Sequence, residues 1–109
     1  MAEINEIIHQ PIRLKVMAAL FAMESDAEAD FTFLRDHLKL TDGNLGAHLE
    51  KLESAGYLSV RKAFVRRKPR TFLRLSRTGR RAFEDYVEAL RSVIYAAPGV
   101  EVKQPQRRK

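Results

Sequence analysis

Apolar residues recur at the spacing of an α-helix in the first part of the chain. From Ile12 they follow at i+4, i+5, i+8 and i+9, and Pro11 stands at the first helical position, where proline is tolerated. The polar stretch 25–30 is expected to be a loop. The pattern therefore predicts a helix from Pro11 to about Met23, preceded by a short helical segment over residues 4–9.

Two more helices follow, with few residues between them. One covers residues 32–38 with Thr32 as its cap, and the other covers residues 42–55 after a cap at Thr41. Gly56 stands where a left-handed residue commonly ends a helix. Such a tight connection between two helices is typical of a helix-turn-helix.

Beyond the third predicted helix, the apolar period changes from helical to alternating. Residues 58–64 and 71–75 alternate as strands do, and the basic segment 66–70 with its proline predicts a turn between them. Helical spacing returns over residues 77–95, after a cap at Ser76. We therefore expect a mainly α-helical chain with one small β-hairpin, in the order of a winged helix-turn-helix whose terminal helix mediates dimerisation.

The length of 109 residues fits one domain. We expect one folded domain over residues 1–95 and a mobile basic tail over residues 96–109. The sequence has no cysteine, no signal-peptide pattern and no apolar stretch long enough to cross a membrane. These features predict a cytoplasmic protein that makes no contact with a membrane.

Positive charge is concentrated in one segment. The net charge is +6, yet residues 61–81 hold ten basic residues and no acidic one, whereas residues 1–60 hold five basic and ten acidic residues. Such a run favours an acidic partner, and the phosphates of a nucleic acid supply that charge. The motifs of nucleophilic and phosphate-binding enzymes are absent, so no enzyme and no cofactor are predicted. No metal site is predicted either, although a site between two chains at Asp36 and His37 stays open as an alternative.

Two segments carry a resemblance to a known group of proteins. LTDGNLGAHLEKLESAGYL at residues 40–58 and KPRTFLRLSRTGRRAF at residues 68–83 resemble small single-domain winged helix-turn-helix regulators of the MarR and ArsR families. The resemblance covers roughly residues 9–95 and implies a homodimeric DNA-binding repressor or activator. It implies that residues 1–95 form a DNA-binding and dimerisation domain and that the protein is associated with a bacterial or archaeal nucleoid. The chain departs from the thiolate metal sensors of the ArsR family in having no cysteine, and it leaves any small-molecule effector open.

The third predicted helix is expected to enter the major groove of DNA. Its leucines form a buried stripe, so the opposite face is free for contact, and an amide or imidazole there can read base edges. The bland alternative is a solvated helix face or a local cap. The residues predicted to contact DNA from this helix are Thr41, Asp42, Gly43, Asn44, Ala47, His48 and Lys51, with Asn44 and His48 as base readers.

The predicted hairpin, residues 61–75, is expected to lie on the DNA backbone and in the minor groove. Its predicted DNA contacts are Arg61, Lys62, Arg66, Arg67, Lys68, Arg70 and Thr71. The alternative is that the run is only solvated surface. One or two of the following arginines are expected to reach flanking phosphates, and the others to pair with the acidic N-terminal half: Arg74, Arg77, Arg80 and Arg81.

The last predicted helix has more apolar surface than one small domain can cover. Phe83 and Val87 are expected to seal the monomer core, and the remainder is left for a second copy. The predicted dimer interface consists of Ile4, Ile7, Ile8, Tyr86, Leu90, Val93 and Ile94. Two alternatives use the same fold, a protein-interaction module and an RNA-binding module. The basic segment disfavours the first, whereas phosphate contacts do not distinguish RNA from DNA.

Overall fold

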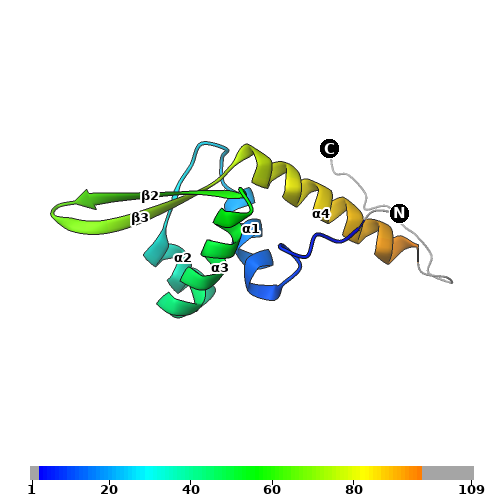
Figure 1. Ribbon diagram of the computed structural model, residues 1–109, viewed down its shortest axis with the longest axis horizontal. Coiled ribbons are helices and arrows are strands. Elements are labelled where there is room, and N and C mark those ends of the chain that lie inside the picture. The colour runs from blue at the N-terminus through cyan, green and yellow to red at the C-terminus, as the bar shows by residue number, and fades with distance from the viewer. Residues whose placement is uncertain (1–2, 97–109) are drawn as a thin grey trace, which may run out of the picture.

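A computed structural model describes residues 3–96, so the tail predicted beyond residue 96 lies outside the described residues. Its elements are α1 (Pro11–Phe21), β1 (Ala29–Asp30), α2 (Phe31–Leu38), α3 (Asp42–Ser54), β2 (Leu58–Val65), β3 (Lys68–Leu75) and α4 (Arg77–Tyr95). Helices α1, α2 and α3 form the body, the β2–β3 hairpin projects from one side, and α4 extends from the other (Figure 1). This architecture confirms the predicted winged helix-turn-helix.

Side-chain caps set the start of every helix. Gln10, Asp30, Thr41 and Ser76 each accept a hydrogen bond from a backbone N–H in the first turn of α1, α2, α3 and α4, respectively. The caps predicted at Thr41 and Ser76 are confirmed. The cap predicted at Thr32 is wrong, because the Asp30 carboxylate accepts the Thr32 N–H at 2.8 Å and α2 starts one residue earlier.

The sheet contains a strand that the sequence pattern did not predict. Its order is β1-β3-β2, with antiparallel neighbours throughout. Strand β1 has only two residues, Ala29 and Asp30, which pair with Leu73 and Phe72. A strand of two residues is too short to show the alternation of apolar and polar positions, so the sequence pattern predicts a loop over residues 25–30.

The hairpin turn is shorter than predicted and has a strained backbone. Strand β3 already begins at Lys68, so only Arg66 and Arg67 connect it to β2. Their φ angles are +54° and +68°, as a two-residue type I′ turn requires. This turn matches the twist of a hairpin, but each non-glycine residue in the left-handed region costs about 1–2 kcal/mol. Lys39, between α2 and α3, has the same conformation with φ +58°.

The end of α3 and the start of α4 are joined through one backbone carbonyl. Gly56, with φ +82°, ends α3 as predicted, and the Tyr57 N–H closes the motif on the Leu52 carbonyl at 3.0 Å. The Tyr57 carbonyl then accepts the Ser76 N–H at 2.9 Å. A Cβ atom at Gly79 would lie 2.1 Å from that carbonyl oxygen, so only glycine permits this close approach. The base of the hairpin is thereby tied to α4.

The N-terminal segment is a turn and not the predicted short helix. The Asn5 side chain accepts the backbone N–H groups of Ile7 and Ile8, at 2.9 and 3.1 Å. Ile8 is fully buried in the core, and Tyr86 is 2% exposed and bonded through its hydroxyl to His9 Nδ1 at 2.9 Å. Their assignment to the dimer interface is therefore wrong, because both side chains complete the core of the monomer. Ile4 and Ile7 are half-buried against the same core.

Candidate nucleic-acid interface

Helix α3 has one buried face and one polar face. Leu45, Leu49 and Leu52 are 0%, 5% and 0% exposed, and they anchor the helix in the core. The opposite face is exposed at Gly43, Asn44, Ala47 and Lys51.

Asn44 carries an amide group on this exposed face. Its backbone N–H is held by Thr41, whereas its amide side chain makes no hydrogen bond within residues 3–96. The amide is free to bind a ligand, since no intramolecular partner competes for it.

Two of the predicted contact residues hold the helix-turn-helix in shape. The Thr41 hydroxyl caps α3, and Asp42 accepts a hydrogen bond from Arg35 Nη1 of α2 at 2.7 Å. Arg35 also bonds Asp36, and the two carboxylates, Asp36 first, raise the pKa of the guanidinium above its ordinary value. Thr41 therefore starts α3, and Asp42 links α3 to α2 through a charge-assisted hydrogen bond.

His48 is less available than predicted. Its ring is half-buried, and Arg13 Nη1 of α1 lies 3.1 Å from His48 Nδ1. Burial, then the charges of Arg13 and Lys51, lower the pKa of His48 below its ordinary value. A guanidinium can only donate, so Nδ1 accepts and Nε2 carries the proton of the neutral ring. Nothing in the sequence indicates the role of Arg13, because its contact with His48 joins residues 35 positions apart.

The hairpin, which we call the wing, presents two different faces. Side chains alternate along a strand, so Val60, Lys62 and Phe64 of β2 share one face with Leu73, Thr71 and Pro69 of β3. The residues of this set nearest the body, Val60, Lys62, Thr71 and Leu73, line a groove together with residues of α3. We call this the inner face of the wing, because it is turned toward α3.

The outer face carries arginines that are already paired. Arg61 donates two hydrogen bonds to Glu28, at 2.9 and 2.7 Å, and Arg70 forms an ion pair with Asp30. These bonds are the main causes that lower the pKa of both carboxyls. The positive charge of the basic run is therefore neutralised within the chain at Arg61 and Arg70, by carboxylates that are distant in sequence. Both residues tie the wing to the strand β1 and the loop before it.

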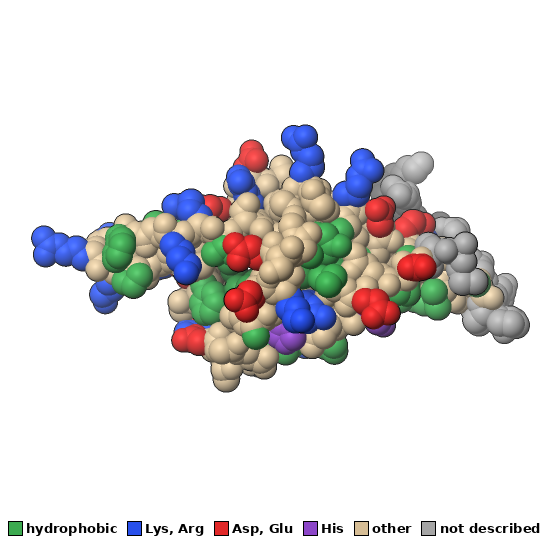
Figure 2. All heavy atoms as spheres, viewed as in Figure 1, with side chains coloured by type: hydrophobic (Ala, Val, Ile, Leu, Met, Phe, Trp, Pro, Cys, Tyr) green, Lys and Arg blue, Asp and Glu red, His purple; other side chains and the backbone are tan. Residues whose placement is uncertain are grey.

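The end of the wing holds positive charge without a counterion. Arg66, Arg67 and Lys68 are exposed, and none forms an ion pair with any of the described residues. Basic side chains project from this end in Figure 2. Phe64 also lies at this end of the wing, and it is 77% exposed.

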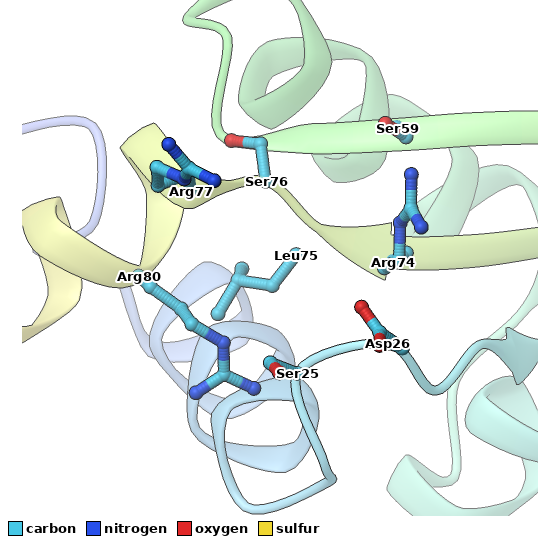
Figure 3. Close-up of a pocket in the computed structure, with 8 residues that line it drawn as sticks. All are labelled: Ser25, Asp26, Ser59, Arg74, Leu75, Ser76, Arg77 and Arg80. Carbon is cyan, nitrogen blue, oxygen red and sulfur yellow. The ribbon is translucent and has the colours of Figure 1, made fainter.

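Three of the arginines after the wing share one pocket. Arg74, Arg77 and Arg80 line one pocket with Asp26 and three serines, Ser25, Ser59 and Ser76 (Figure 3). Arg80 points to the end of α1, where its guanidinium donates to the carbonyls of Phe21 and Met23, and the other two arginines point away from it. Arg80 is thus a structural residue that caps the C-terminal carbonyls of α1.

Helix α4 extends past the core that it helps to build. Its last buried residue is Ala89, and Leu90 is half-buried. Val87, Val93 and Ile94 are 39%, 52% and 52% exposed, so the expectation that Val87 seals the monomer core is wrong. Phe83, at 8%, does seal it.

No group of three or more metal-binding side chains gathers within residues 3–96 of one chain, where His37 stacks on Phe33 with ring centroids 5.6 Å apart. None of the described helices is long and apolar enough to cross a membrane.

Comparison with known proteins places this arrangement among DNA-binding domains. The family described as a winged helix DNA-binding domain matches residues 12–94. Over 82 residues the chain is 34% identical to an uncharacterised protein of Methanocaldococcus jannaschii, covering 75% of this chain and 86% of that protein. A transcriptional regulator homologue of Pyrococcus horikoshii OT3 has a similar solved structure, with TM-score 0.76, 29% identity, and coverage of 84% of this chain and 88% of that chain. A PadR family transcriptional regulator of Eggerthella lenta matches with TM-score 0.59 and 25% identity over 75% of each chain.

Proposed function

The chain belongs to the winged helix DNA-binding domain family and is a DNA-binding regulator, not an enzyme, and we propose that it reads a specific duplex sequence as a homodimer. In this proposal α3 lies in the major groove and the wing covers the backbone and the adjacent minor groove. The observation that carries it is the exposed polar face of α3 beside a wing whose inner face is turned toward that helix. These two elements are held in place by contacts within the chain, made by Thr41, Asp42, Arg61 and Arg70.

The two base readers have different hydrogen-bonding capacities. The Asn44 amide offers both a donor and an acceptor, which suits adenine N6 and N7. His48, with Nδ1 occupied by Arg13, offers a donor at Nε2. His48 therefore selects acceptors, such as guanine N7 and O6 or thymine O4, over the exocyclic amines of adenine and cytosine.

The homodimer is supported by the uncovered apolar surface of α4. Val87, Leu90, Val93 and Ile94 lie at or beyond the edge of the monomer core, which ends at Ala89. Ile4 and Ile7 of the N-terminal segment are half-buried and leave part of their surface for the same contact. A two-fold dimer would require a palindromic site with half-sites about 34–36 Å apart.

Selection from a random duplex pool tests the whole proposal. We expect the wild-type protein to enrich a palindrome with two half-sites that are one helical turn apart. A pool of duplex RNA of equal length, offered in competition at fixed salt, should leave that enrichment unchanged. Enrichment of RNA, or of no sequence at all, would contradict specific DNA reading.

Asn44→Ala is expected to reduce specificity. The free energy of binding to the selected palindrome should become less favourable by about 1–3 kcal/mol, because the amide contacts a base edge. Binding to a scrambled duplex should change little. Lys51→Ala is the matched control, since loss of a phosphate contact weakens both duplexes alike. Fluorescence anisotropy titrations measure both affinities. An equal loss on both duplexes for Asn44→Ala would assign Asn44 to positioning.

Arg67→Ala is expected to change the salt dependence of binding. The logarithm of affinity should fall with the logarithm of salt concentration, with a slope of about −0.9 per phosphate neutralised, so removal of one contact flattens the slope by about one unit. Lys15→Ala removes one positive charge from an exposed position of α1 that is not among the predicted DNA contacts, and it should leave the slope unchanged. Equal slopes in wild type and Arg67→Ala would remove the wing tip from the interface.

A further inference from the structure

The end of the wing combines positive charge with an uncovered aromatic ring. Phe64 is 77% exposed, which exceeds every other large apolar side chain among residues 3–96. It pairs across the hairpin with Pro69, two positions from the strained turn. In Figure 2 apolar side chains lie beside basic ones at this end of the molecule.

The pairing of Phe64 and Pro69 makes them one apolar ridge. Val65 and Lys68 flank the two-residue turn and form its hydrogen-bonded pair, so the next pair, Phe64 and Pro69, is a non-hydrogen-bonded one. Proline has no N–H to donate and fits such a position without loss. Side chains approach most closely in non-hydrogen-bonded pairs, with Cα atoms about 4.5 Å apart.

The ridge lies on the inner face of the wing. Along both strands it continues the row formed by Lys62 and Thr71, which lines the groove against α3. A duplex held by α3 is therefore met by this face, and not by the outer face with its paired arginines. Arg66, Arg67 and Lys68 add unpaired positive charge to the same end of the wing, so the occupant of this end is a polyanion that also offers apolar surface.

We propose that Phe64, supported by Pro69, enters the minor groove as an apolar wedge, partly unstacks one base step and bends the DNA. The inference rests on the proposed function and adds to it a second source of specificity. Apolar side chains inserted in this way bend duplexes by about 20–90° toward the major groove. Pyrimidine–purine steps unstack most easily, so the wedge favours such a step at a position that α3 does not contact.

The test measures DNA shape and affinity together. A duplex of about 30 base pairs that carries the selected palindrome is labelled at its two ends, and energy transfer reports their distance. Wild-type protein should bring the ends together. Phe64→Ala should weaken binding about tenfold and abolish most of the change in energy transfer, with an unchanged salt slope because no charge is removed. Phe64→Leu, which keeps a wedge, should restore most of the bend.

Val65→Ala is the matched control. Val65 is the adjacent apolar residue of the same strand, 39% exposed, and its side chain lies on the outer face. Affinity and bend should stay at the wild-type values. An equal loss in Val65→Ala and Phe64→Ala would assign both effects to hairpin stability and overturn the wedge.

Other outcomes separate the wedge from its alternatives. If wild type binds the palindrome without bending it, the wedge is wrong and the proposed function stands; if wild type binds no duplex, both fail. In another outcome, the Phe64→Ala variant sediments less with phosphatidylcholine–phosphatidylserine vesicles than wild type while its DNA binding is intact. That result would identify the ridge as a membrane contact. Phe64→Ala that changes the mass of the protein in sedimentation equilibrium would make it a contact between copies. Either result overturns the wedge.

Discussion

Replacing Gly79 by alanine is expected to lower the free energy of unfolding by about 3 kcal/mol. The new Cβ would lie 2.1 Å from the Tyr57 carbonyl oxygen, a backbone atom that accepts the Ser76 N–H and cannot move alone. Relief would require α4 to separate from the base of the wing, with loss of that hydrogen bond and of packing around Phe83. Overpacking costs about 1–3 kcal/mol, and a lost buried hydrogen bond adds about 1 kcal/mol.

Urea denaturation followed by circular dichroism, at one protein concentration, measures this effect. Gly46→Ala is the matched control, because nothing lies within 4 Å of a Cβ built at this position of α3. Alanine is favoured over glycine inside a helix by about 0.5–1 kcal/mol, so the control should be more stable than wild type. A Gly79→Ala protein as stable as wild type would show that α4 is not held through Tyr57.

Leu90→Lys combined with Ile94→Lys is expected to convert the proposed dimer into a folded monomer. The two positions are four residues apart and share one side of α4, so four lysines would meet in a two-fold interface. The change removes two apolar side chains per chain, each worth about 1.5–3 kcal/mol on burial, and adds like-charge repulsion. The variant should retain weak, salt-sensitive DNA binding and lose its preference for the palindrome over a single half-site.

The matched control places the same spacing on the opposite side of the helix. Glu88→Lys with Ser92→Lys alters two exposed positions that face away from Leu90 and Ile94 by helical geometry. Sedimentation equilibrium at micromolar concentration should give a dimer for wild type and control and one chain for the Leu90/Ile94 variant. A wild-type mass of one chain, or a double variant that stays dimeric, would refute this interface.

Local sequence signals were sufficient to predict α1 to α4 and the hairpin, but not the turn that replaces the helical segment predicted over residues 4–9. The caps at Thr41 and Ser76 and the stop at Gly56 are read from one or two neighbouring residues. Strand β1 has no such signal, since two residues become a strand only by pairing with Leu73 and Phe72. Pro69 suggested a turn because proline disfavours strands, yet here it lies at a non-hydrogen-bonded position.

The charged residues of the candidate site show the same limit. The basic run was evident, but its neutralisation at Arg61 depends on Glu28, and the contact of His48 depends on Arg13. Each partner is more than 30 positions away in the chain. The exposed face of α3 followed from its leucine stripe, because burial on a helix fixes both sides at once. Gly79 gave no sign of its role, since its constraint comes from the Tyr57 carbonyl.

The two-arginine turn at the wing tip carries positive charge at a cost in the stability of the hairpin. A type I′ turn favours Asn-Gly, and exchanging Arg66 and Arg67 for that pair would relieve the left-handed strain and strengthen the hairpin. The same exchange would remove two of the three unpaired cations at the tip. Under the proposed function, a variant engineered for heat resistance with consensus turn residues would therefore bind DNA more weakly, an instance of the trade-off between stability and activity. The residues that best fit the backbone of this turn would then differ from the residues that best neutralise phosphates.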